Sequence, residues 1–358
     1  MLDKQPQRDL VETTERKRYF DPSPSEDLDL GPLTHLPGLW KNVTEDGSLT
    51  DGRGWNLIAL PFFEEGQFRD FRLLMNRYNE ELRFTFVDDM VPNRGVEKNP
   101  SAEFDQFVVT LDYQQAIKQT DADDFSQTPL AGGSDLAIHH EPGLFLHMLN
   151  RRTDGIDVAR LATVPHGNSA LAIGSSSTYN GPPQNVDGAS GFPEGAIAAD
   201  EEINAAVDAA TADNAYLRPY NKFTVEPFLG IFSAKTPFDT LKGALSAFNV
   251  VRTTELRMDT SRDKAGIHNI PFVERRADAN FMRSTFYILE LEETGADGKP
   301  KMALAYTQFI FLDFFRRRDG KEGLIRWPHI SMNVMEKVDV PKEDDPYMTK
   351  KSCYDFGG

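Results

Sequence analysis

Cysteine is almost absent from this chain. Its 358 residues include a single cysteine, Cys353, which lies in a polar stretch near the C-terminus. One thiol cannot form an intramolecular disulfide or a cysteine-based zinc site, and no Cys-x-x-Cys-His motif exists for covalent attachment of heme. So little cysteine is typical of a reducing compartment, and we expect the protein in the cytoplasm.

Long apolar runs are missing as well. Residues 1–30 are rich in charged side chains and proline and have no apolar core of the kind found in signal peptides. No later stretch reaches the length of a membrane span. We interpret residues 1–30 as a flexible N-terminal arm, residues 31–340 as a single domain and residues 341–358 as a C-terminal tail.

Basic residues are outnumbered by acidic residues. The chain has 39 Lys and Arg residues against 56 Asp and Glu residues, which gives a formal net charge of −17. Such a charge opposes contact with nucleic acid and with anionic membranes, so neither is an expected partner. The expected partner is a small-molecule ligand or substrate, and a homodimer remains an open alternative.

The residues that are present favour β-strands. Alternating apolar and polar positions dominate residues 36–174 and again residues 250–338, with β-branched and aromatic residues at strand length. Between these stretches, residues 181–195 have the composition of a loop and residues 196–214 predict a helix. Thr236-Pro237 predicts the start of a second helix, which runs toward Phe248. The inserted region therefore covers about residues 175–250.

The last predicted strand carries a candidate ligand. In the segment Arg326 to Val334, strand geometry places His329, Ser331 and Asn333 on one face. A histidine on the inner face of a barrel can bind a metal, although a single histidine in a strand is more often a hydrogen-bonded structural residue. The pattern alone leaves both interpretations open.

Several blocks along the chain share an order with a known family. They are Gly38-Leu39-Trp40 with Gly54-Trp55-Asn56 and Leu60-Pro61-Phe62, then residues 78–84, 111–115, 138–144, 163–168 and 304–306, and finally Pro328-His329 with residues 335–338. In this order they resemble the nitrobindin family of heme-binding β-barrels. The resemblance covers residues 36–174 and roughly 280–338. The chain departs from the family where extra residues split the opening strand, and at His166, where a small polar residue is expected.

The resemblance implies a mainly β fold, an antiparallel up-and-down β-barrel of lipocalin or nitrobindin type with helical insertions. It also implies non-covalent heme b with His329 as the iron ligand, and NO binding or isomerisation of peroxynitrite. Met332, Phe309 and Phe311 are candidates for the apolar wall of the cofactor site, although such side chains are more often plain core.

Two further histidines are candidates for the site. Successive strand residues face opposite sides, so only one of His139 and His140 can point inward, and the family pattern indicates His139. It could donate a hydrogen bond to a bound oxygen species, as a catalytic residue, or it could buttress the barrel wall. His166 could line the entrance of the cofactor site, or it could be an exposed turn residue.

Whether the chain is an enzyme stays open. It has no Gly-x-Ser-x-Gly elbow, no His-Glu-x-x-His motif, no Walker loop and no Gly-x-Gly-x-x-Gly turn after a strand. A heme-dependent isomerase or a peroxidase-like oxidoreductase would fit, and the inserted helices could then build a pocket for an organic substrate, form a dimer contact or cover a barrel edge. The alternative from another class is a heme-free, lipocalin-like barrel that binds or transforms an apolar small molecule.

Overall fold

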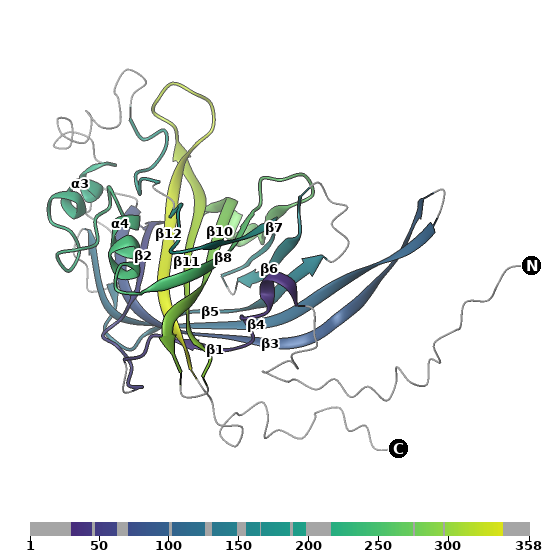
Figure 1. Ribbon diagram of the computed structural model, residues 1–358. Helices are drawn as coiled ribbons and strands as arrows, with labels where there is room; N and C mark the ends of the chain where they lie inside the picture. Colours follow the sequence, from purple (N-terminus) through teal and green to yellow (C-terminus); the bar gives the residue numbers. More distant parts are fainter. Residues whose placement is uncertain are drawn as a thin grey trace, which may run out of the picture.

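The computed structural model describes most of the predicted domain. It covers residues 30–338 except 45–46, 63–70, 100–101, 126–130, 149–154, 165, 187–188, 198–215, 275 and 296–297. The predicted arm (apart from Leu30), the tail with Cys353 and almost all of the helix predicted at 196–214 lie outside the described residues. The structure is 60% strand and 10% helix and contains a closed antiparallel barrel of 10 strands (Figure 1), which confirms the predicted mainly β barrel fold.

The strands are β1 (Gly38–Lys41), β2 (Gly54–Pro61), β3 (Phe71–Asn99), β4 (Ala102–Phe125), β5 (Ala137–Met148), β6 (Val158–Val164), β7 (Asn168–Asn180), β8 (Val250–Asp259), β9 (Gly266–Asn269), β10 (Asp278–Thr294), β11 (Pro300–Arg316) and β12 (Leu324–Val338). The helices are the 3₁₀ turn η1 (Gly31–Leu33), α3 (Arg218–Val225), α4 (Phe238–Leu245) and α5 (Pro271–Glu274).

The barrel is closed by two segments that share one strand position. Each strand pairs with its neighbour from β3 to β8, then through β10 and β11 to β12, while β9 pairs with β7 off this path. Both β1 and β2 pair with β12 on one side and with β3 on the other. The two parts of the opening block, which extra residues separate in the sequence, therefore lie in a single position of the barrel wall.

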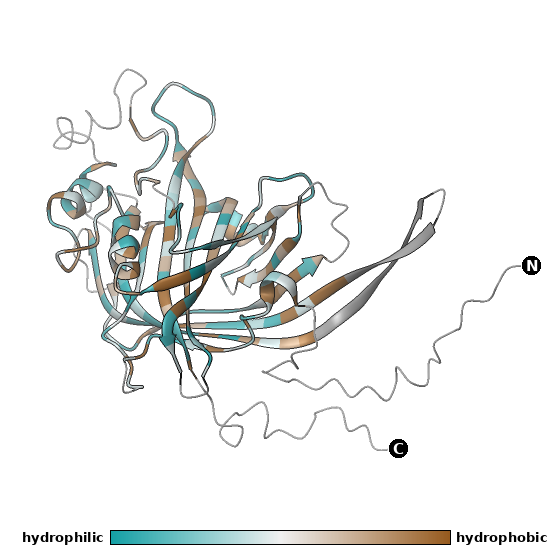
Figure 2. Ribbon diagram, in the orientation of Figure 1, coloured by the Kyte–Doolittle hydropathy of each residue, from teal (hydrophilic) through white to brown (hydrophobic). Residues whose placement is uncertain are grey.

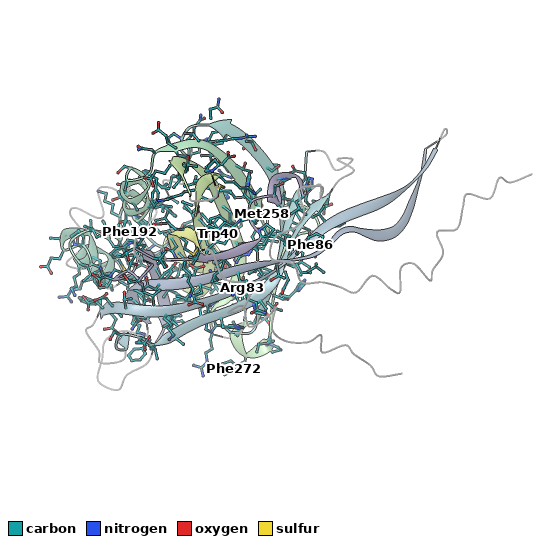
Figure 3. The ribbon with its side chains drawn as sticks, turned by 60° about the horizontal axis from the view of Figure 1, so that its bottom comes forward. Trp40, Arg83, Phe86, Phe192, Met258 and Phe272 are labelled. Carbon is teal, nitrogen blue, oxygen red and sulfur yellow. The ribbon has the colours of Figure 1, made fainter. Side chains whose placement is uncertain are left out.

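Apolar and polar residues alternate along many of the strands (Figure 2). Because successive side chains face opposite sides, each face of the wall has its own apolar cluster. The inner cluster includes Phe84, Phe145 and Met258, and Leu33 and Leu36 from the segment around η1 are buried in it. Trp40 also belongs to it and donates a hydrogen bond from its ring nitrogen to the carbonyl oxygen of Leu36 at 2.8 Å. Trp40 and Met258 lie in the body of the barrel, whereas Phe272 on α5 lies at its margin (Figure 3).

The inserted helices lie beside the seam between β2 and β12 (Figure 1). α4 contacts β12. Phe238 and Leu241 of α4 are buried in the outer cluster with Met332. The ring of Trp55 on β2 packs 5.4 Å from that of Phe232. The sequence predicted α4 but not α3, which starts at Arg218-Pro219, although both helices are eight residues long. The described part of the insert therefore packs on the outer face of the barrel.

Among the described residues, no helix combines the length and apolar character that crossing a bilayer requires.

Candidate binding site around His329

His329 lies on the inner face of β12, together with Ser331 and Asn333. Its Nε2 is 2.7 Å from Oδ1 of Asn56, and the Ser331 hydroxyl donates to the same oxygen at 3.2 Å. Asn333 donates to Glu80 at 2.9 Å. The predicted common face is therefore present, and it faces the interior rather than the helices.

Apolar side chains flank His329 at the same level of the barrel. His329 is paired with Ile310 on β11, and Ile310 is paired with Met282 on β10. On the other side, Ser331 of β12 pairs with Asn56 of β2, and the antiparallel register then places Ile58 beside His329. Ile58 is in turn paired with Leu74 on β3. We call this row, Leu74, Ile58, His329, Ile310 and Met282, the His329 girdle. All of its members except Met282 keep part of their surface accessible, so solvent reaches the inner face here.

A row of amides lies one level deeper. Asn56 donates to Oδ1 of Asn76 at 3.0 Å, and Asn76 donates to Oε1 of Gln119. Gln119 in turn donates to the carbonyl oxygens of Ala131 and Gly133 at 3.3 and 2.9 Å. Because every amide donates in the same direction, Oδ1 of Asn56 is left as an acceptor for His329. The chain of amides thus runs from β2 to the segment before β5.

This arrangement fixes the protonation of His329. Burial, and then the neighbouring His139 and His166, lower the pKa of His329 to about 3, so the ring is neutral near pH 7. Since Oδ1 of Asn56 can only accept, Nε2 must carry the proton and Nδ1 the lone pair. Nδ1 has no hydrogen-bond partner among the described residues.

His139 and His166 meet at the same end of the barrel. His139 on β5 places Nε2 3.2 Å from Oε2 of Glu141, and its ring centre lies 5.6 Å from that of His166. His166, in the turn between β6 and β7, is exposed, and burial and the nearby His139 lower its pKa. His140 is exposed on the opposite face of β5. Of the adjacent pair His139 and His140, the structure therefore turns His139 inward.

A buried ion pair lies below His139. Arg160 on β6 donates to Oε1 of Glu141 at 2.7 Å, and both side chains are only 2% exposed. The same guanidinium donates to Ser284 at 2.8 Å and to Gln308 at 2.6 Å, across the interior. Burial alone would raise the pKa of Glu141, but Arg160 and the hydrogen bonds from His139 and Tyr113 lower that pKa to about 2. Glu141 is therefore ionised at every ordinary pH.

Gly143 makes room for this pair. A Cβ at Gly143 would overlap the carbonyl oxygen of Leu161 and the ring of Tyr113. Because the ring can lie over the glycine, the Tyr113 hydroxyl reaches Oε1 of Glu141. The glycine of the His-x-Glu-x-Gly block therefore has a steric role.

A second carboxylate, Glu80, stabilises the seam. It accepts hydrogen bonds from Tyr306 at 2.7 Å, from Gln115 at 2.7 Å and from Asn333 at 2.9 Å. Burial raises the pKa of Glu80, and among the described residues no Lys or Arg side chain forms an ion pair with it. We interpret this cluster as structural because its polar atoms are occupied by one another.

Three predicted wall residues lie away from this surface, which corrects the expected wall. Met332 is fully buried in the outer cluster, and Phe309 packs against that cluster. Phe309 is paired with Ile330, and Phe311 with Pro328, whereas His329 is paired with Ile310. Since successive residues face opposite sides, none of these three shares the face of His329. These residues were predicted from their bulk and from their proximity to His329 in the sequence. The strand alternation that placed His329 was not applied to them.

Only weak patterns in the sequence mark the residues that do surround the site. Arg160 stands between Val158 and Ala162, two inner-cluster positions, and a charged residue on an apolar strand face requires a buried partner. Asn56 belongs to the Gly54-Trp55-Asn56 block, but its role depends on pairing with β12, which no local pattern reveals.

No family model, curated protein or solved structure matches this chain. Among the described residues, no three His, Cys, Asp or Glu side chains are arranged to hold a metal ion by themselves. The site is therefore interpreted from its own geometry.

Proposed function

We propose that this protein binds heme b non-covalently at the His329 girdle, with His329 as the iron ligand. One observation carries the proposal: the neutral ring of His329 donates one N–H to Asn56 and leaves its other nitrogen without a partner among the described residues. Metal-ligating histidines almost always donate their second ring N–H to an oxygen in this way.

The neighbouring residues fit the group. A porphyrin needs apolar contact on its faces, and Ile58, Leu74 and Ile310 offer accessible apolar surface beside the imidazole. A neutral imidazole needs no deprotonation before it donates its lone pair, so protons do not compete with iron near pH 7. The resemblance to nitrobindins supports the same assignment.

Heme, when bound, would supply an iron centre that takes small oxygen or nitrogen species. The residues of the chain would hold the cofactor against the girdle and place His139 near the bound molecule. NO binding and peroxynitrite isomerisation are the proposed activities. The described helices pack on the outer face, which gives no support to a peroxidase-like or rearrangement pocket for an organic substrate between them.

Titration of the purified protein with hemin tests the proposal. We expect a saturable Soret band at one heme per chain, lost in His329→Ala and retained in His140→Ala, whose histidine lies exposed on the outer face. A band that is indifferent to His329→Ala would contradict it.

The second candidate is a heme-free barrel that binds an apolar small molecule, and the accessible apolar girdle favours it. Absence of a specific Soret band, together with saturable binding of a fluorescent apolar probe that survives His329→Ala, would favour this candidate instead.

A further inference from the structure

The environment of Glu141 determines which nitrogen of His139 carries a proton. Arg160 and Tyr113 both donate to Oε1 of Glu141, and Oε2 faces Nε2 of His139 at 3.2 Å. Glu141 is ionised and can only accept, so Nε2 must donate. Whenever the ring of His139 is neutral, its lone pair therefore lies on Nδ1.

That lone pair is available to a ligand. No described residue is hydrogen-bonded to Nδ1 of His139, and the side chain is 19% exposed, in contrast to the 2% of Glu141 below it. The guanidinium that holds Glu141 also donates to Gln308 at 2.6 Å, and Gln308 is paired with Ser331 on the face of His329. A small molecule in the His329 girdle would thus lie near both.

We infer that His139 is a catalytic proton acceptor for a small, weakly acidic molecule bound at the girdle, such as a peroxide or another H–X acid, and that the buried Arg160–Glu141 pair is its positioning device. In this step the H–X bond breaks, its electron pair stays on X, and the proton forms an N–H bond at Nδ1. The resulting imidazolium is stabilised by Glu141, as in other carboxylate–histidine pairs.

This inference rests on the proposed function, since the molecule is bound beside His329. The charged and titratable groups that face His139 are Glu141 and His166, both in contact with it, and Glu80 and His329, whose pKa values a positive charge on His139 lowers. Arg160 acts through Glu141.

The first test uses the hemin-free protein, so it stands whether or not heme binds. Two-bond ¹H–¹⁵N spectra of the histidine rings, assigned with His139→Gln, report which nitrogen is protonated in the neutral ring. We expect Nε2–H for His139 and a mixture of tautomers in Glu141→Gln, where an amide can either donate or accept. A neutral His139 that carries its proton on Nδ1 in the wild type would overturn the inference.

The second test uses cyanide, supplied as HCN, which must lose its proton to bind as an anion. In the hemin-loaded protein we expect His139→Gln to slow cyanide association by about 10²-fold or more, while His140→Gln leaves the rate unchanged. Equal rates in both variants would refute the role of His139. Lack of a Soret band would instead refute the proposed function.

Discussion

His329 donates its Nε2 proton to Oδ1 of Asn56 across 2.7 Å, and Asn56 can accept it because its own amide nitrogen donates onward to Asn76. The orientation of one imidazole in β12 therefore depends on β2, β3 and, through Gln119, on β4. A neutral amide at this place keeps the ring neutral. A carboxylate there would make the ring more basic.

Asn56→Asp is expected to raise the pKa of His329 well above its present value of about 3, because a carboxylate would stabilise the protonated ring. Histidine ¹H–¹⁵N chemical shifts followed from pH 8 to pH 4 measure this directly. Asn180→Asp makes the same charge change at an exposed position and should leave the pKa of His329 as it is. An unchanged titration in Asn56→Asp would show that the contact does not exist in solution.

The lowered pKa of His329 predicts a pH dependence of stability. Between pH 6.5 and about 3 the unfolded chain binds a proton at His329 that the folded chain does not, so the free energy of unfolding must fall as the pH falls. The limit is about 1.4 kcal/mol per pH unit, and we expect about 1 because solvent reaches part of the ring.

Urea unfolding of the wild type and of His329→Gln between pH 6.5 and pH 4.5 isolates this contribution, since the carboxylates respond equally in both proteins. The wild type should lose stability more steeply. Parallel curves would mean that His329 titrates normally in the folded protein.

Removing one member of the buried ion pair should be costly. Arg160→Met leaves Glu141 buried without its main partner, and we expect a loss of about 3–5 kcal/mol in the free energy of unfolding. The double variant Arg160→Met with Glu141→Leu should recover much of that loss, since both charges are then gone. Urea denaturation of the wild type, the two single variants and the double variant decides, and additive effects of the two substitutions would contradict the pairing.

The steric role of Gly143 can be tested against a second glycine. Gly143→Ala would push a methyl group into the Leu161 carbonyl and the Tyr113 ring, and we expect a loss of about 1–3 kcal/mol. Gly243 lies in α4 with open space around it, so Gly243→Ala should instead stabilise the protein by about 0.5–1 kcal/mol. Thermal unfolding of both variants should therefore show shifts of opposite sign.

The sequence predicted the fold class because strand alternation is a local signal. The same alternation predicted correctly that His329, Ser331 and Asn333 share a face, and that only one of His139 and His140 is turned inward. It also predicted strand-rich stretches over residues 36–174 and 250–338, and β10 and β11 lie in the second of them.

What could not be predicted depends on contacts between distant strands. The partners of Arg160 lie on β4, β5, β10 and β11, and the residues beside His329 come from β2 and β11. Register between strands so far apart in sequence is set by the closed barrel and not by any local pattern. For this reason the predicted wall of Met332, Phe309 and Phe311 was misplaced, although the prediction of an inward histidine was not.

The double occupancy of one strand position by β1 and β2 also bears on the order in which the chain assembles. Asn42, just after β1, is hydrogen-bonded to Asn333 of β12 at 2.8 Å, and the two residues are 291 positions apart. The strands from β3 to β8 can pair with neighbours as soon as these are made, but the ring cannot close until β12 exists. Closing so long a loop carries a large entropy cost, and such topologies fold slowly. An open, curved sheet with two free edges is therefore the expected late folding intermediate, and in it Asn56 and His329 are still apart.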